Sequence, residues 1–216
     1  LPLFMALYLL VPIYGQNYSK MTEKAIKKEL GKGKNSKEAA AIARKLKKKG
    51  FELLGDSNKP LEVVIKIHQI KLNELGENGI EFEGSSLRTK SKNLGELLAK
   101  NSVQINYAQQ ATQIMSHPFY RVEYYDGPPQ TSETLSNFFK EYELNVEEGI
   151  KTLLSPSYSV IRHNNDETSE IRSFFIIDES KAREIRSQAL EAALSKYELS
   201  EDEINYFRSV VDTPVK

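Results

Sequence analysis

The sequence contains no cysteine, although it runs to 216 residues. This absence excludes a disulfide framework, a thiolate nucleophile and a zinc–thiolate site, and no residue can serve as the acylated cysteine of a lipobox. A chain of this length buries enough apolar surface to fold without disulfide bonds, so the absence does not indicate the compartment. Other features of the sequence have to indicate it.

The sequence is also poor in catalytic motifs. Its three histidines, His68, His117 and His163, are isolated from one another, and it contains no H-E-x-x-H or G-x-S-x-G motif. His68 lies on the apolar stripe of a predicted helix, with no acidic or histidine companion at metal-ligand spacing, and we expect it to have a structural role. The pattern predicts no catalytic residue, no cofactor and no metal, although a triad can still assemble from distant residues.

Charged side chains are absent from the first fifteen residues, most of which are large and apolar. A membrane-spanning helix needs about 20 such residues, whereas this run is interrupted by Pro12 and ends at Gly15 and Gln16. The pattern is typical of a cleaved export signal, which we place at residues 1–16. It predicts a periplasmic, cell-surface or secreted protein with no transmembrane span after cleavage.

The charges are unevenly distributed, although the whole chain has a net charge of zero. Residues 20–49 carry a net charge of +9, which leaves −9 on the remainder. We interpret residues 17–50 as a basic helical segment appended to an α+β domain of residues 51–216. Its last turn is the densest in cations, and a basic patch is predicted at Lys45, Lys47, Lys48 and Lys49.

A Lys-rich helix of this kind usually turns its charges to water. The alternatives are docking on the acidic remainder of the chain, or binding to anionic lipid, to an anionic envelope polymer such as peptidoglycan, or to nucleic acid. Nucleic acid is the weakest of these, because no aromatic residue between Tyr18 and Phe51 can stack on a base. The partners we expect are envelope proteins or anionic envelope polymers.

The apolar spacing and the turn residues predict an alternation of helices and strands. Helices are expected at 35–49, 60–75, 89–115, 132–154, 179–197 and 201–211, and strands at 79–86, 119–125, 158–163 and 171–177. Gly50 is expected to end the first helix in a left-handed conformation, and Ser200 and Glu203 to form a capping box. Within Asp178, Glu179 and Ser180, carboxylates are expected to cap a helix.

These elements predict an α+β fold, in which a small, largely antiparallel sheet packs on long amphipathic helices. The sheet is expected to pack its apolar face against the helices at 89–115 and 132–154. The predicted core face of the first of these helices consists of Leu94, Leu97, Leu98, Ile105, Ala108 and Ala111.

The aromatic segment after His117 is the candidate binding site of the sequence. It consists of Phe119, Tyr120, Tyr124 and Tyr125, which can stack on sugars or peptides, although strand packing is the commoner use of such residues. It motivates an alternative function, a hydrolase or carbohydrate-binding enzyme with a cleft near residues 117–125. That alternative requires His117 or His163 to approach a carboxylate within a concave pocket.

The order of elements resembles a known family. The run Gly84-Ser85-Ser86, the helix that includes Lys92–Lys100, and the hairpin Tyr158–Ile177 leading into Ser180-Lys181-Ala182 resemble the Lpp-twenty-like outer-membrane lipoprotein domain. Residues 37–61 resemble a group of uncharacterised exported proteins of Bacteroidales-type bacteria. The resemblance extends over about residues 35–196 and implies a non-catalytic structural or interaction module of the cell envelope, although this chain has no lipobox cysteine.

Overall fold

The computed structural model describes residues 34–55, 59–121 and 129–215, and within them the α+β class is confirmed. Four antiparallel strands form one sheet in the order β1-β3-β4-β2. The strands are β1 (Glu52–Leu53), β2 (Gly79–Ser85), β3 (Pro156–His163) and β4 (Ser169–Asp178). The helices are α2 (Lys34–Lys48), α3 (Leu61–Glu74), α4 (Lys92–Arg121), α5 (Pro129–Ile150), α6 (Glu179–Leu194) and α7 (Glu201–Val210), with a 3-10 turn η2 (Gly76–Asn78).

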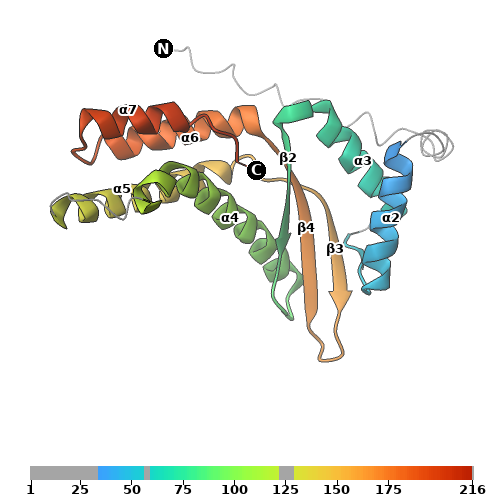
Figure 1. Cartoon of the computed structure of the whole chain (residues 1–216). Helices are drawn as coiled ribbons and strands as arrows, with labels where there is room; N and C mark the ends of the chain where they lie inside the picture. Colours follow the sequence, from blue (N-terminus) through green and yellow to red (C-terminus); the bar gives the residue numbers. More distant parts are fainter. Residues whose placement is uncertain (1–33, 56–58, 122–128, 216) are drawn as a thin grey trace, which may run out of the picture.

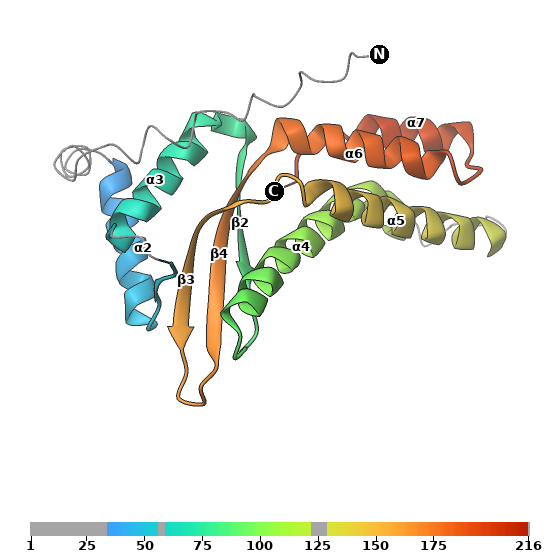
Figure 2. The ribbon, with the colours of Figure 1, turned by 180° about the vertical axis from the view of Figure 1, so that it is seen from behind.

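Helices cover both faces of the sheet (Figure 1, and from behind in Figure 2). Side chains alternate between the two faces of a strand, so neighbouring residues enter different layers. On β4, Phe174 packs with α2 and α3, whereas Phe175 packs with α4. We call these the pocket face and the α4 face of the sheet.

The predicted starts and ends of several helices are confirmed. Gly50 adopts a φ of +82°, and the Phe51 amide donates to the Leu46 carbonyl at 3.1 Å, which closes α2 with a Schellman-type turn. Ser200 and Glu203 form the capping box of α7. The side chain of Asp178 accepts from the Ser180 amide at the start of α6. These local signals need no tertiary contact, which explains why the sequence reveals them.

The basic segment is part of the fold from residue 39 onward and is not an appendage there. Ala39, Ala43 and Leu46 of α2 are buried against Phe51 and the pocket face of the sheet. Their spacing of three and four residues places them on one side of the helix, while the lysines lie on the other side. The rest of the predicted segment, residues 17–33, lies outside the described residues.

The predicted aromatic strand at 119–125 is wrong in its first part. Phe119 and Tyr120 lie in the last turn of α4, which continues past Pro118 to Arg121. The residue before a proline disfavours helical geometry without forbidding it, and the contacts between α4 and α5 support the longer helix. Tyr124 and Tyr125 lie outside the described residues, so the proposed aromatic site is not assembled in the described part of the chain.

The predicted core face of α4 is also wrong in its first half. Leu94, Leu97, Leu98 and Ile105 are 47%, 53%, 37% and 40% exposed, respectively. The sheet instead covers the opposite side of the helix, where Ala99, Val103 and Tyr107 are fully buried. Small residues there let α4 approach the strand closely: a Cβ at Gly84 would overlap the Ala99 carbonyl and lie 2.8 Å from Val103 Cγ2. Ala108 and Ala111, farther along, are buried as predicted.

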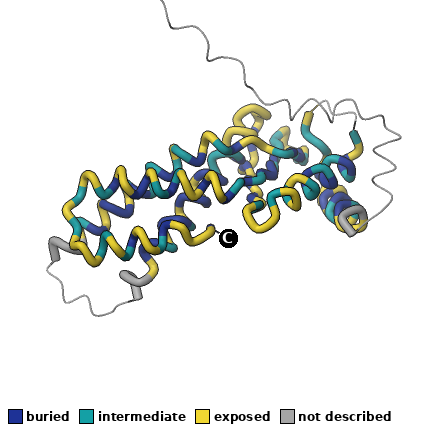
Figure 3. The backbone as a smooth tube through the Cα atoms, turned by 90° about the horizontal axis from the view of Figure 1, so that it is seen from above, coloured by how far each residue is buried: buried dark blue, intermediate teal, exposed yellow. Residues whose placement is uncertain are grey.

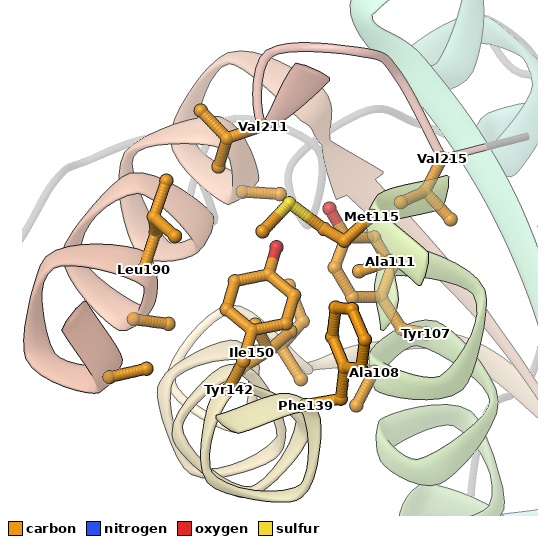
Figure 4. Close-up of a cluster of buried hydrophobic side chains, with 14 of the residues drawn as sticks. Tyr107, Ala108, Ala111, Met115, Phe139, Tyr142, Ile150, Leu190, Val211 and Val215 are labelled. Carbon is orange, nitrogen blue, oxygen red and sulfur yellow. The ribbon is translucent and has the colours of Figure 1, made fainter. Parts of the chain in front are cut away.

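Beyond the sheet, α5 and α7 pack against α4, and α6 packs against α5 and α7 (Figure 1). Figure 4 shows Tyr107 and Met115 of α4, Phe139 and Tyr142 of α5 and Leu190 of α6 meeting in this core. Figure 3 shows the buried positions on the inward sides of the helices. The helix at 132–154 was expected to pack on the sheet; α5 packs mainly on α4 and α6 instead.

Candidate functional site

A cavity of about 280 Å³ lies between α2, α3 and the pocket face of the sheet. Its volume is near the lower end of the range for small-molecule sites. The residues around it are of three kinds: apolar and aromatic, acidic, and basic or amide. They are Ile42, Leu46, Ile65, Tyr158 and Phe174; Glu81 and Glu83; and Lys45, Lys49, His68, Gln69 and Arg172.

The aromatic part of the wall is rigid and buried. The rings of Tyr158 and Phe174, which pair across β3 and β4, stack with centroids 4.4 Å apart. His68 meets the Tyr158 ring edge-on at 5.2 Å. Burial, with smaller contributions from the nearby Glu81 and Glu83 carboxylates, raises the pKa of Tyr158 well above its usual range, so its hydroxyl is neutral at physiological pH.

His68 is buried, and it has an acidic companion that is distant in sequence. It is 1% exposed on α3, and its Nε2 makes a short hydrogen bond with the Glu81 carboxylate. A carboxylate only accepts, so Nε2 is the donor. The two residues are 13 positions apart and meet because η2 reverses the chain between α3 and β2. The other ring nitrogen, Nδ1, is closed to solvent and has no hydrogen-bond partner in the described part of the chain.

Arg172 contributes a charge that is already neutralised. Its Nη1 donates to Glu83 at 3.0 Å and its Nε donates to Glu170 at 2.9 Å. The guanidinium also lies 4.7 Å from the centroid of the Phe51 ring, in a cation–π geometry. Arg172 and Glu83 are therefore fixed parts of the wall.

The structure divides the predicted basic patch. Lys45 and Lys49, one turn apart at the end of α2, line the cavity, whereas Lys47 points to Glu62 of α3 at 3.8 Å. Lys48 is exposed and is not among the lining residues. Within the described residues, the ammonium groups of Lys45 and Lys49 have no ion-pair partner. The basic edge of the pocket therefore consists of two of the four predicted lysines.

The sequence missed the acidic half of the site. Glu81 and Glu83 alternate with Ile80 and Phe82, a pattern that predicts a strand with one face in water. The strand is half-buried as expected, and its exposed Glu81 and Glu83 side chains also line the cavity on the pocket face. The remaining signal in the sequence was the buried position of His68 itself, since a buried polar ring requires a partner.

A second cavity, of about 570 Å³, lies beside His117. It is lined by Gln110, Gln113, Ile114, His117, Thr213 and Pro214. His117 is exposed and has no ion-pair partner among the described residues. His163 is 3.6 Å from Glu52, and both side chains are largely exposed at the edge of the sheet. Among the described residues, the short hydrogen bond between a histidine and a carboxylate is therefore that of His68 with Glu81. The alternative of an enzyme with a cleft near residues 117–125 named His117 and His163 and did not name His68.

No protein-family model, curated protein or solved structure matches the chain, so the family resemblance stays a prediction. Within the described ranges, no group of three or more histidine and acidic side chains is placed to hold a metal ion. Across the same ranges, no helix has the length and apolar character required to cross a membrane. The site therefore has to be interpreted from its own geometry.

Proposed function

We propose that the protein is a non-catalytic binding module that takes a small ligand into the pocket between α2, α3 and the sheet. The observation that carries this proposal is the cavity itself, with an aromatic floor and charged edges of both signs. Helix-covered sheet faces are ordinarily filled with close-packed apolar side chains. An open cavity in that position leaves the apolar side chains around it without packing partners, and ligand binding explains why it is there.

The state of His68 favours binding over catalysis. In a histidine–carboxylate dyad that acts as a general base, the carboxylate holds one ring nitrogen and the other faces the substrate. Here the nitrogen that Glu81 leaves free is closed to solvent. Glu81 itself is 45% exposed, so the pair presents its carboxylate to the cavity.

An NMR screen of small polar metabolites against the isotope-labelled protein tests this function. We expect at least one compound to shift the signals of His68 and Tyr158, with saturation as its concentration rises. The variant Ile42→Trp fills the cavity with a larger side chain and should abolish those shifts. The matched control Leu97→Trp adds the same side chain at an exposed position of α4 and should keep them. A screen without any hit at these residues rejects the function.

We further propose that the module is exported and works in the cell envelope. The support is the uncharged apolar segment at residues 1–15, which lies outside the described residues. Fusing residues 1–34 to a reporter that is active only outside the cytoplasm tests the proposal. We expect reporter activity, and a charged substitution such as Leu9→Arg should abolish it. Reporter activity that survives Leu9→Arg refutes export through this segment and leaves the pocket proposal untouched.

A further inference from the structure

The charges around the pocket are arranged in two opposite edges. Lys45 lies on α2 and Lys49 lies in the turn that directly follows it, while Glu81 and Glu83 lie on β2, with the cavity between the two groups. Within the described part of the chain, neither lysine lies within ion-pair distance of either carboxylate. The two edges therefore do not neutralise each other directly.

The groups left for a ligand are fewer than the charges that line the cavity. Glu83 is already bonded to Arg172, which in turn is bonded to Glu170. Glu81 Oε2 accepts a hydrogen bond from His68 Nε2, while Oε1 makes no hydrogen bond within the described part of the chain. Two carboxylate oxygens on the β2 side, Glu81 Oε1 and Glu83 Oε2, and two ammonium groups on the α2 side remain within the described part of the chain.

These groups together match a ligand of mixed charge. A carboxylate oxygen accepts from a cationic amine, and lysine ammonium groups donate to a carboxylate; both are charge-assisted hydrogen bonds. Between them, the stacked rings of Tyr158 and Phe174 and the side chains of Ile42 and Ile65 offer an apolar surface. The cavity of about 280 Å³ limits the ligand to a small molecule.

We infer that the ligand is a small zwitterion of amino-acid or dipeptide size, with its ammonium group at Glu81 and its carboxylate between Lys45 and Lys49. This inference rests on the proposed function, because it names the ligand class of the same pocket. An anion without an amine leaves Glu81 unpaired next to the ligand, and an amine without an anion leaves the two lysines without a counter-charge. A ligand with a single charge therefore makes charge-assisted hydrogen bonds at only one edge of the pocket.

Calorimetric titration of the full chain with leucine and alanyl-leucine, each compared with two blocked derivatives, tests the inference. N-acetylation removes the cation and C-terminal amidation removes the anion, while the apolar part stays the same. We expect at least one parent compound to bind and each of its blocked forms to bind at least tenfold more weakly. A blocked form that binds as tightly as its parent overturns the zwitterion assignment.

Variants assign the two ends of the ligand. Glu81→Gln should weaken the parent compound at least tenfold and leave the affinity of the N-acetyl form unchanged, because that form has no cation to lose. The double variant Lys45→Met/Lys49→Met should weaken binding of the parent compound and leave the affinity of its C-terminal amide unchanged. Lys48→Met, on the same turn but outside the lining, is the matched control and should bind like the unaltered protein. Equal losses in Lys48→Met and the double variant contradict the assignment.

The two proposals fail in different ways. If the metabolite screen finds a ligand at His68 and Tyr158 but neither parent compound binds, the zwitterion inference is refuted and the binding function stands. If no compound of either experiment reaches these residues, both are refuted. Circular dichroism of every variant, together with its thermal midpoint, shows that a lost affinity is not a lost fold.

Discussion

The two faces of the sheet pack differently against the helices that cover them. On the α4 face, Phe82, Phe175 and Ile177 are buried, and Gly84 lets α4 approach the backbone of β2. On the pocket face, the same strands place Arg172, Glu83 and Glu81 between the sheet and its helices. A cavity remains on this face, between the sheet and the helices α2 and α3. The side chains that alternate on each strand thus give the two faces of the sheet different layers.

The helical core beyond the α4 face also contains charged side chains, but there they are buried and paired. Arg186 and Glu179 form an ion pair with side chains only 1% and 2% exposed, and Arg186 also donates to the Val211 and Thr213 carbonyls at 3.1 and 3.2 Å. Tyr107 donates to Glu179 at 3.2 Å. Every charge there has partners, whereas the lysines of the pocket have none among the described residues. This contrast is why we propose a structural role for the Arg186–Glu179 cluster and a binding role for the pocket.

The largest expected effect is at the buried ion pair. Arg186→Met leaves the Glu179 carboxylate buried and uncompensated, so the free energy of unfolding should fall by about 3–5 kcal/mol in urea denaturation. Adding Glu179→Leu should recover part of that loss. The counterpart on the pocket face, Arg172→Met, should cost only about 1 kcal/mol because the side chain is 25% exposed. Equal losses at the two arginines would remove the distinction between the two regions.

Gly84 tests the close approach of α4. Gly84→Val places a side chain against the Ala99 carbonyl and Val103, so we expect a loss of roughly 3 kcal/mol in the free energy of unfolding. The neighbouring Ser85 lies on the other face of the same strand and is exposed. Ser85→Val should therefore change stability by less than about 1 kcal/mol. A tolerated valine at 84 would show that α4 is not held this close to the strand.

Alkaline pH probes burial in both regions at once. Burial raises the pKa of Tyr107, Tyr142 and Tyr158 above the value of about 10 that they have in the unfolded chain. Below pH 10 both states are neutral, and above it only the unfolded state releases these protons. Stability is therefore intact below about pH 10 and falls as the pH rises toward the folded pKa values, by up to about 1.4 kcal/mol per pH unit and tyrosine.

Tyrosinate absorbance during an alkaline titration, followed together with far-UV circular dichroism, measures this. Tyr142→Phe is the sharpest variant, because the Tyr142 hydroxyl has no hydrogen-bond partner in the described part of the chain. It should leave stability at pH 7 almost unchanged and make the loss above pH 10 less steep. If all tyrosines of the native protein ionise near pH 10, the burial of these rings is contradicted.

The smallest effect is expected on the exposed side of α4. Leu97 is 53% exposed, so Leu97→Gln should change the free energy of unfolding by no more than about 0.5 kcal/mol. Val103→Ala, on the buried side of the same helix, should cost about 1–2 kcal/mol. A large loss at Leu97 would restore the core face expected from the sequence.

The hairpin and the caps were predictable because their signals are local. Asn164 to Glu167 form a turn between two β-branched and aromatic runs, and the Asn164 amide donates to Thr168 at 2.8 Å as β3 turns into β4. The core face of α4 was not predictable in the same way. The first half of α4 has apolar residues on two opposite sides, with leucines on one side and Ala99, Val103 and Tyr107 on the other. Apolar spacing does not tell which of two apolar sides a sheet will cover.

The sequence by itself determined the α+β class, most element boundaries and the basic end of α2, because periodicity, capping residues and charge act over a few neighbouring residues. Long-range packing settles which side of α4 is buried, that His68 meets Glu81, and that Lys45 and Lys49 border a cavity while Lys48 does not. These outcomes depend on how helices are seated on the sheet. The position of a helix on the sheet follows from the sizes of side chains that are distant in sequence, such as those of Gly84 and Ala99.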